Sequence, residues 1–163
     1  TAIIVPTHRS FYDFLIISYI CFSYPELGID IPFIAAADDF RKIPIVGWLA
    51  RGAHAFFIKR GGSRIDPDLG RELNRIANST KSTPFIEVFI EGKRSRYRTF
   101  APAKTGLLRC LAESDQQYLI LPVTINYECL PDQLSLIQQA NDGSGRTMSL
   151  KSLMLWLNRA FSG

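Results

Sequence analysis

The sequence predicts an α/β domain in which a mainly parallel central sheet is flanked by helices. Short apolar runs rich in branched and aromatic residues alternate along the chain with helix-like segments. The runs are apolar almost throughout, rather than apolar at every second position, and such strands are expected where helices cover both faces of a sheet. Functional side chains are then expected where the strands end.

Five apolar runs are predicted as strands, because residues that favour strands dominate each of them. In chain order they are 2–6 (AIIVP), 31–36 (IPFIAA), 55–59 (AFFIK), 85–90 (FIEVFI) and 118–125 (YLILPVTI). Helix-like segments lie at about 11–23, 43–52, 66–79, 104–113 and 150–161. The clearest loop is 141–145 (NDGSG), whose residues are typical of turns.

Length and composition indicate one globular unit. The 163 residues, 47% of them hydrophobic, suffice for a single domain over 1–163 with a sizeable core. The first residue is not methionine and the last residues directly follow an amphipathic run, so we expect a piece of a longer protein. Cys21, Cys110 and Cys129 are widely spaced and odd in number, so no disulfide framework or zinc site is predicted, and a reducing compartment is expected.

Charge and hydropathy limit the partners. A formal net charge of +4 favours anionic partners without naming the anion. The longest nearly uncharged stretch, 14–25, is shorter than the ~18 residues of a membrane-spanning helix. Segment 150–161 is amphipathic and suits either a bilayer interface or packing against the rest of the protein, and we favour packing.

The stretch VPTHRSFYDFLII (5–17) sets a histidine and an aspartate where a strand passes into a helix. Ser10 is predicted to cap that helix, and Asp13 suits its first turn. A carboxylate that holds one ring nitrogen of His8 would leave the other nitrogen to accept a proton from an alcohol. Because no GxSxG elbow is present, such a pair would act on a hydroxyl of the substrate.

A second stretch, FIEGKRSRYRTFAPAKTG (89–106), carries a strand end, a glycine and a cluster of basic residues. Gly92 would let a ligand approach the backbone, and arginine forks bind phosphate oxygens in pairs. The basic residues are Lys93, Arg94, Arg96, Arg98 and Lys104, with Lys59 and Arg60 at an earlier strand end. A solvated basic turn and nucleic-acid binding are the other interpretations, but the sequence shows no nucleic-acid-binding motif, so a small phosphate group is favoured.

These stretches together resemble the glycerol-3-phosphate and dihydroxyacetone-phosphate acyltransferase family. Its blocks match in order: HRSFYD (8–13), AFFIKR (55–60), FIEGKRSR (89–96) extended by PAKTGLL (102–108), and LPVTINYE (121–128). The resemblance implies the glycerol-phosphate acyltransferase-like α/β fold. It also implies transfer of an acyl group from acyl-CoA or acyl carrier protein to the hydroxyl of glycerol-3-phosphate or dihydroxyacetone phosphate, as in the first step of glycerophospholipid synthesis.

By the family's motifs, His8 is implied to be the general base and Asp13 its orienting partner in an HxxxxD motif. The implied acceptor-binding residues are Lys59, Arg60, Glu91, Gly92, Arg94, Ser95 and Arg96. Glu91 is alternatively a structural partner of Arg94 or Arg96, and the part played by Pro122 in the fourth block stays open. Backbone amides around Arg9 and Ser10 are candidate oxyanion donors. No metal and no further cofactor are expected.

Two residues depart from the family's second block, where His54 occupies a glycine position and Lys59 an arginine position. We expect His54 to be structural rather than a second base. The resemblance also implies an enzyme that works at a membrane surface, and the expected reducing compartment places it on the cytoplasmic side. No nucleic-acid partner is expected, because the sequence shows no nucleic-acid-binding motif. A lysophospholipid (1-acylglycerol-3-phosphate) acyltransferase and a catalytically silent lipid- or phosphate-binding module are the alternatives.

Overall fold

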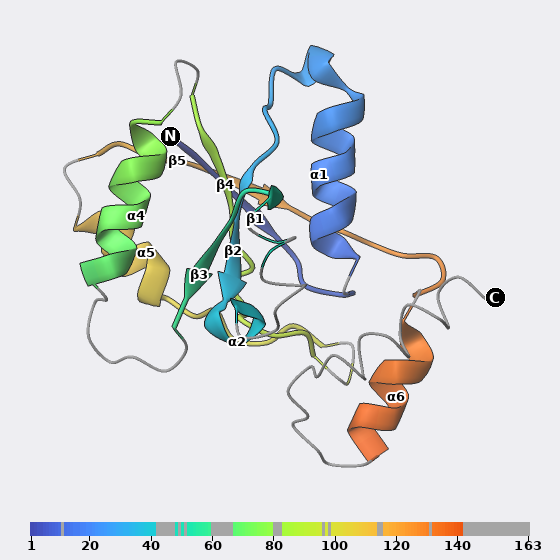
Figure 1. Ribbon diagram of the computed structural model, residues 1–163. Helices are drawn as coiled ribbons and strands as arrows, with labels where there is room; N and C mark the ends of the chain where they lie inside the picture. The colour runs from blue at the N-terminus through green and yellow to red at the C-terminus, as the bar shows by residue number, and fades with distance from the viewer. Residues whose placement is uncertain are drawn as a thin grey trace.

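The computed structural model describes residues 1–10, 12–41, 48, 50, 52–59, 67–79, 83–95, 97, 99–113, 116–130 and 132–141. Within them, five parallel strands form one sheet in the order β3-β2-β4-β1-β5 (Figure 1). The strands are β1 (Ala2–Pro6), β2 (Phe33–Ala37), β3 (Ala55–Ile58), β4 (Phe85–Glu87) and β5 (Leu119–Val123). The α/β class with a parallel sheet is thus confirmed.

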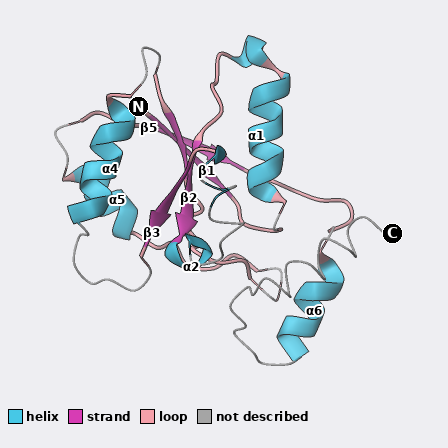
Figure 2. Ribbon diagram, viewed as in Figure 1, coloured by secondary structure: helices cyan, strands magenta, loops and turns pink. Residues whose placement is uncertain are grey.

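Helices cover both faces of this sheet, as the apolar strands indicated. Figures 1 and 2 show α4 (Pro67–Ala77) and α5 (Gly106–Ala112) on one face and α1 (Asp13–Ser23) on the other. The larger core cluster joins the sheet to α4 and α5 through buried residues such as Ile3, Ile76 and Ile86. A smaller cluster joins it to α1 through Ile4, Ile17 and Cys21, and this second cluster lies next to the site described below.

The predicted strands are all present. The first, Ala2–Pro6, has the predicted ends, and the third ends at Ile58, one residue earlier than predicted. The second begins at Phe33, two residues later than predicted, directly after Pro32, which lacks the N–H that a ladder uses. The fourth ends at Glu87 rather than at residue 90, because the chain then turns through Gly92, whose φ is +69°. The fifth is also shorter than predicted, at Leu119–Val123.

The predicted helices agree less completely with those of the structure. Those predicted near 11–23, 66–79 and 104–113 correspond to α1, α4 and α5. Two described helices were not predicted: α2 (Asp38–Arg41) and α6 (Gln133–Asn141), and a short 3-10 turn, η1 (Pro25–Leu27), follows α1. The predicted helix 150–161 lies outside the described residues, as do seven of the ten residues of 43–52 and the loop after residue 141.

The carboxyl ends of the parallel strands lie at one edge of the sheet, and the motif residues follow them there. His8 comes after β1, Glu91 after β4 and Tyr127 after β5. Helix α6 lies beyond the same edge (Figure 1). None of the described helices is long and apolar enough to span a bilayer.

Candidate active site

Asp13, the first residue of α1, is the centre of the hydrogen-bond network at this edge, and its side chain is fully buried. Its Oδ2 atom lies 2.9 Å from Nδ1 of His8 and accepts the backbone N–H groups of Arg9 (2.6 Å) and Ser10 (2.8 Å). Its Oδ1 atom accepts the hydroxyl of Tyr127 at 2.7 Å. Both oxygens of this carboxylate therefore have donors, as a buried charge requires.

These contacts determine the charge of Asp13. Burial by itself raises the pKa of this carboxyl, but the hydrogen bonds from His8, Tyr127, Ser10 and Arg9 outweigh burial and hold the pKa below its usual value. An ionised carboxylate only accepts hydrogen bonds, so Nδ1 of His8 must carry a proton that it donates to Asp13. Nε2 of the imidazole is then the nitrogen that can take a proton from another group.

Two local predictions at this turn are wrong. Ser10 does not cap α1: the N-cap residue is Tyr12, without a side-chain cap bond, and the hydroxyl of Ser10 instead accepts the backbone N–H of Tyr12 (3.2 Å) and donates to Asp132 (2.8 Å). The amides of Arg9 and Ser10, expected as oxyanion donors, are already used within the protein. Both donate to Asp13, which reaches back from the first helical turn and takes the acceptor role expected of a cap.

Glu91 holds the main chain of the site in place. Its Oε1 atom accepts the backbone N–H of His8 at 2.9 Å, and its Oε2 atom accepts that of Ala101 at 2.8 Å. Glu91 is 6% exposed, so these bonds form away from solvent. The ring of His8 also packs on Phe89, with centroids 4.3 Å apart. The third motif block therefore supports the backbone and the ring of the histidine in the first block.

Arg94 pairs with Asp132, which lies just before α6, and both side chains are almost completely buried. The second oxygen of Asp132 accepts the hydroxyl of Ser10, so the aspartate ties the third block to the first. Burial lowers the pKa of Arg94, while Asp132 and Asp13 act in the opposite direction. The charge of this arginine is thus balanced inside the protein.

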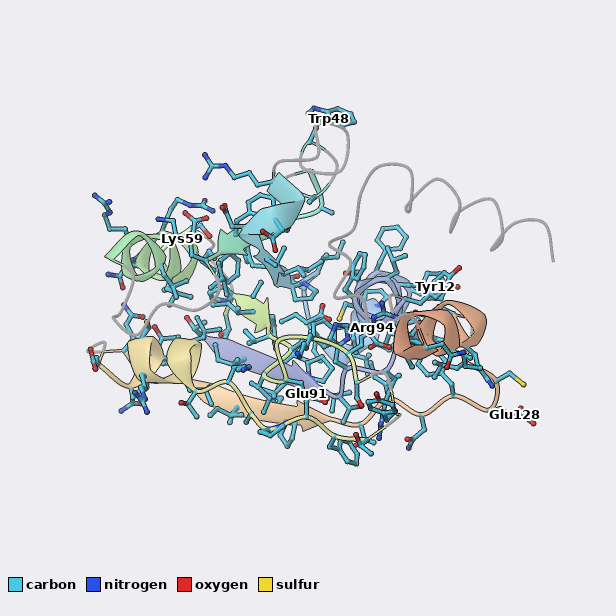
Figure 3. All side chains as sticks on the ribbon, turned by 90° about the horizontal axis from the view of Figure 1, so that it is seen from below. Tyr12, Trp48, Lys59, Glu91, Arg94 and Glu128 are labelled. Atoms are coloured by element: carbon cyan, nitrogen blue, oxygen red, sulfur yellow. The ribbon has the colours of Figure 1, made fainter. Side chains whose placement is uncertain are left out.

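Of the other predicted phosphate ligands, the structure describes Lys59 and Ser95. Lys59 follows β3, the edge strand opposite β5, and Figure 3 shows it beside α4 and apart from Arg94. The hydroxyl of Ser95 lies 2.9 Å from Oγ1 of Thr99 and accepts the N–H of Tyr97. Arg60 and Arg96 lie outside the described residues.

Two features of the structure favour glycine at position 92. Its φ is +69°, and a Cβ atom there would lie 3.0 Å from Cγ of Lys104. Lys104 belongs to the PAKTG extension and thus packs over the turn of the third block.

His54, at the position where the family usually has glycine, shows why glycine suits it. Its φ is +59°, in the left-handed region that side chains rarely adopt. Its ring is exposed and stacks on Phe33, with centroids 5.1 Å apart. The residue therefore has a structural contact at the β2–β3 side of the sheet.

Two site residues were missed from the sequence, Tyr127 and Asp132. Tyr127 lies within the block LPVTINYE, four residues after β5 ends, whereas Pro122 of the same block is an exposed residue of β5. Asp132 follows a leucine and a proline and precedes QLSLIQQA, and this aspartate before an apolar-periodic run was the available signal for both α6 and the residue.

Metal ligands do not gather in the part of the chain that the structure describes: no group of three His, Cys, Asp or Glu side chains there could hold an ion. Cys21, Cys110 and Cys129 are not joined by disulfides.

Comparison with known proteins places the chain. A sequence model of the family described as Acyltransferase matches residues 1–126, which contain the His8–Asp13 pair and most of the fourth block. The chain belongs to this acyltransferase family. It is 33% identical over 134 residues to the dihydroxyacetone phosphate acyltransferases of Bos taurus and Homo sapiens. It is 35% identical over 133 residues to the glycerol-3-phosphate acyltransferase of Pseudomonas fluorescens.

A further relative, the probable mitochondrial glycerol-3-phosphate acyltransferase of Caenorhabditis elegans, is 31% identical over 147 residues. These alignments cover 77 to 81% of this acyltransferase domain but only 15 to 19% of the relatives. The chain thus spans about a fifth or less of the length of the proteins it matches.

Proposed function

We propose that the protein transfers a fatty acyl group from acyl-CoA or acyl carrier protein to the hydroxyl of glycerol-3-phosphate or dihydroxyacetone phosphate. The observation that carries the proposal is the 2.9 Å contact between His8 and a buried, ionised Asp13 at the carboxyl edge of the sheet. Membership of the acyltransferase family and the names of its relatives support this choice of reaction and acceptor.

In the proposed reaction, Nε2 of His8 takes the proton of the acceptor hydroxyl as its oxygen attacks the thioester carbonyl. The tetrahedral intermediate then collapses, the carbon–sulfur bond breaks, and the imidazolium returns a proton to the leaving thiolate. Asp13 stabilises the imidazolium that forms in between and stays ionised itself. Anchoring the acceptor phosphate nearby would make the attack effectively unimolecular.

The acceptor phosphate is proposed to bind basic residues of the second and third blocks, Lys59, Arg60, Arg94 and Arg96, with Ser95. The overall charge of +4 supports an anionic substrate. Glu91 and Gly92 contribute by shaping the turn that carries these residues, since Glu91 binds two backbone amides and Gly92 adopts a positive φ. Because Arg94 is paired with Asp132, a phosphate that binds Arg94 would share the guanidinium group with that carboxylate.

We also propose that the protein works at a membrane surface facing the cytoplasm, since the product carries a long acyl chain. The outward side of α1 supports this proposal. Among its large apolar side chains, Tyr19 is 67% exposed and Phe22 is 72% exposed. Aromatic side chains of this kind suit the interface between lipid and water.

The test uses the full-length protein with labelled palmitoyl-CoA or palmitoyl carrier protein and, in turn, glycerol-3-phosphate, dihydroxyacetone phosphate and lysophosphatidate. Wild type is compared with His8→Ala and with His54→Ala, which removes the exposed histidine away from the site. We expect turnover of one of the first two acceptors that is lost only in His8→Ala. Turnover of lysophosphatidate alone would assign the alternative acceptor, and activity that survives His8→Ala would refute the mechanism.

A lack of turnover with every acceptor and donor would favour a silent lipid- or phosphate-binding module. Such a module would bind acyl-CoA or anionic lipid equally well in wild type and in His8→Ala. Thermal unfolding of both variants shows whether a loss of turnover reflects chemistry or a loss of folded protein.

A further inference from the structure

Tyr127 brings the fourth motif block into contact with the catalytic pair. It follows the edge strand β5, and its hydroxyl donates to Oδ1 of Asp13 at 2.7 Å. The residue is partly buried and packs against the cluster that contains Ile4, Ile17 and Ile125. Burial raises the pKa of the phenol, and so does its bond to the neighbouring carboxylate, so the hydroxyl keeps its proton and stays a donor.

The two oxygens of Asp13 are held differently. Oδ2 receives three donors from the stretch His8–Ser10, which lies directly before its own helix. Oδ1 receives the hydroxyl of Tyr127 from a strand end more than a hundred residues away. The terminal torsion of an aspartate is broad and has no sharp minimum of its own, so donors on both oxygens are what fix the plane of the carboxylate.

We propose that Tyr127 is a positioning residue of the catalytic pair: by holding Oδ1 of Asp13, it directs Oδ2 at Nδ1 of His8 and so fixes the orientation and tautomer of the imidazole. The inference rests on the proposed function. It also gives the fourth block a physical task, which is to tie the end of β5 to the pair that follows β1. Those two strands are neighbours in the sheet and pair from Ala2↔Leu119 to Pro6↔Val123.

If Tyr127 served only to pack against the apolar cluster of Ile4, Ile17 and Ile125, phenylalanine would do so equally well, because the ring would keep its place. The hydroxyl is what distinguishes the two side chains; it donates to the carboxylate of Asp13 and also has a side-chain hydrogen bond with Ser10. Tyr127→Phe removes both contacts and keeps the ring, and the Asp13→Asn background described below separates the contact with Asp13 from the one with Ser10. Tyr24→Phe is the matched control, since it removes a phenolic hydroxyl from an exposed residue directly after α1.

Steady-state kinetics of the full-length protein are measured for both variants. A hydrogen bond to a charged group is strong enough that Tyr127→Phe should lower kcat on the order of tenfold or more, while KM for acceptor and donor stays within about twofold. Tyr24→Phe should match wild type. Wild-type kcat in Tyr127→Phe would overturn the proposal, as would a loss confined to KM.

A double-mutant cycle separates an effect through Asp13 from a general loss of packing. If Tyr127 acts by positioning Asp13, its removal should cost little further activity in an Asp13→Asn background. Equal losses in the wild-type and Asp13→Asn backgrounds would show that Tyr127 acts independently of Asp13, and would overturn the proposal.

A measurement that does not depend on the reaction keeps the inference separate from the proposed function. In full-length protein with isotope-labelled histidine, the Nδ1 proton of His8 bonded to Asp13 is followed by NMR. Tyr127→Phe should shift this resonance or speed its exchange with water, whereas Tyr24→Phe should leave it in place. An unchanged resonance overturns the positioning role even if the acyltransferase activity is confirmed, and a shifted one supports it even if no tested acceptor turns over.

Discussion

Asp13 and Glu87 are two fully buried carboxyl groups near the same helix, and their surroundings differ in almost every respect. Asp13 accepts hydrogen bonds on both oxygens, and its pKa lies below the usual value. Neither oxygen of Glu87 in β4 has a hydrogen-bond partner, and burial, followed by the nearby charge of Asp13, raises its pKa to about 8. Burial alone therefore does not decide the charge of a carboxyl group; the number of donors does.

Asp132 shows a third solution. It is also buried, and it is balanced by the guanidinium of Arg94 together with the hydroxyl of Ser10. The three carboxyl groups thus differ in what stabilises them. Asp13 has several neutral donors and a histidine, Asp132 has the positive charge of Arg94, and Glu87 keeps its proton. Each of them predicts a different response to substitution.

The largest effect is expected from Asp13→Asn, because a neutral amide cannot stabilise an imidazolium as the carboxylate does. We expect kcat/KM to fall by roughly 10³-fold or more in full-length protein, with the fold retained. The measurement is the same acyl-transfer assay, accompanied by circular dichroism. Activity within a fewfold of wild type would mean that the carboxylate's charge is irrelevant to the reaction.

Asp132→Ala should be the most damaging to stability, because it leaves the cation of Arg94 buried without its partner. The free energy of unfolding is expected to fall by about 3–5 kcal/mol in chemical denaturation. Replacing both members, as Asp132→Leu with Arg94→Met, should cost clearly less, since no charge is then left buried. A double variant as unstable as the single one would contradict this account.

Glu87→Gln tests the protonated carboxyl through pH. The folded protein keeps this proton up to about pH 8, whereas the unfolded chain loses it near its ordinary value of 4.5, so wild-type stability should decline as pH rises between these values. Glutamine does not titrate, so the free energy of unfolding of the variant should rise relative to that of wild type by a few kcal/mol across that window. Denaturation at pH 5, 7 and 9 measures this gain.

The control for that experiment is Glu72→Gln, which removes a carboxylate that pairs with Arg75 on the surface of α4. The pKa of Glu72 is lowered by that pairing, so Glu72 titrates below the pH range in which Glu87 does. Glu72→Gln should therefore leave the decline of stability between pH 5 and 9 as it is in wild type. Parallel stability curves for Glu87→Gln and wild type would show that Glu87 is ionised in the folded protein.

The smallest effect is expected at two serines that differ as the carboxyl groups do. The hydroxyl of Ser18 in α1 is buried without a partner, so Ser18→Ala should be neutral or stabilise by up to about 1 kcal/mol, helped by the helix propensity of alanine. Ser10→Ala removes a donor to Asp132 and an acceptor for Tyr12, and should destabilise by about 1–3 kcal/mol. Thermal unfolding of both variants measures the contrast, and equal effects would contradict it.

The sequence by itself determined the fold class and the edge of the sheet where the site lies. Apolar runs separated by helical periods predict parallel strands because both patterns reflect burial along a local stretch of chain. It also indicated the pair His8 and Asp13, since five positions spanning a strand end and a first helical turn bring two side chains together locally.

Only the tertiary structure decided which distant residues complete that pair. Tyr127 and Asp132 reach Asp13 and Ser10 across more than a hundred residues of sequence, because neighbouring parallel strands and α6 meet at one edge of the sheet. Glu91 and Arg94 were found from the sequence, yet their partners, backbone amides and a buried aspartate, were not. Hydrogen-bond partners depend on which strand ends lie side by side, and a one-dimensional pattern does not contain that information.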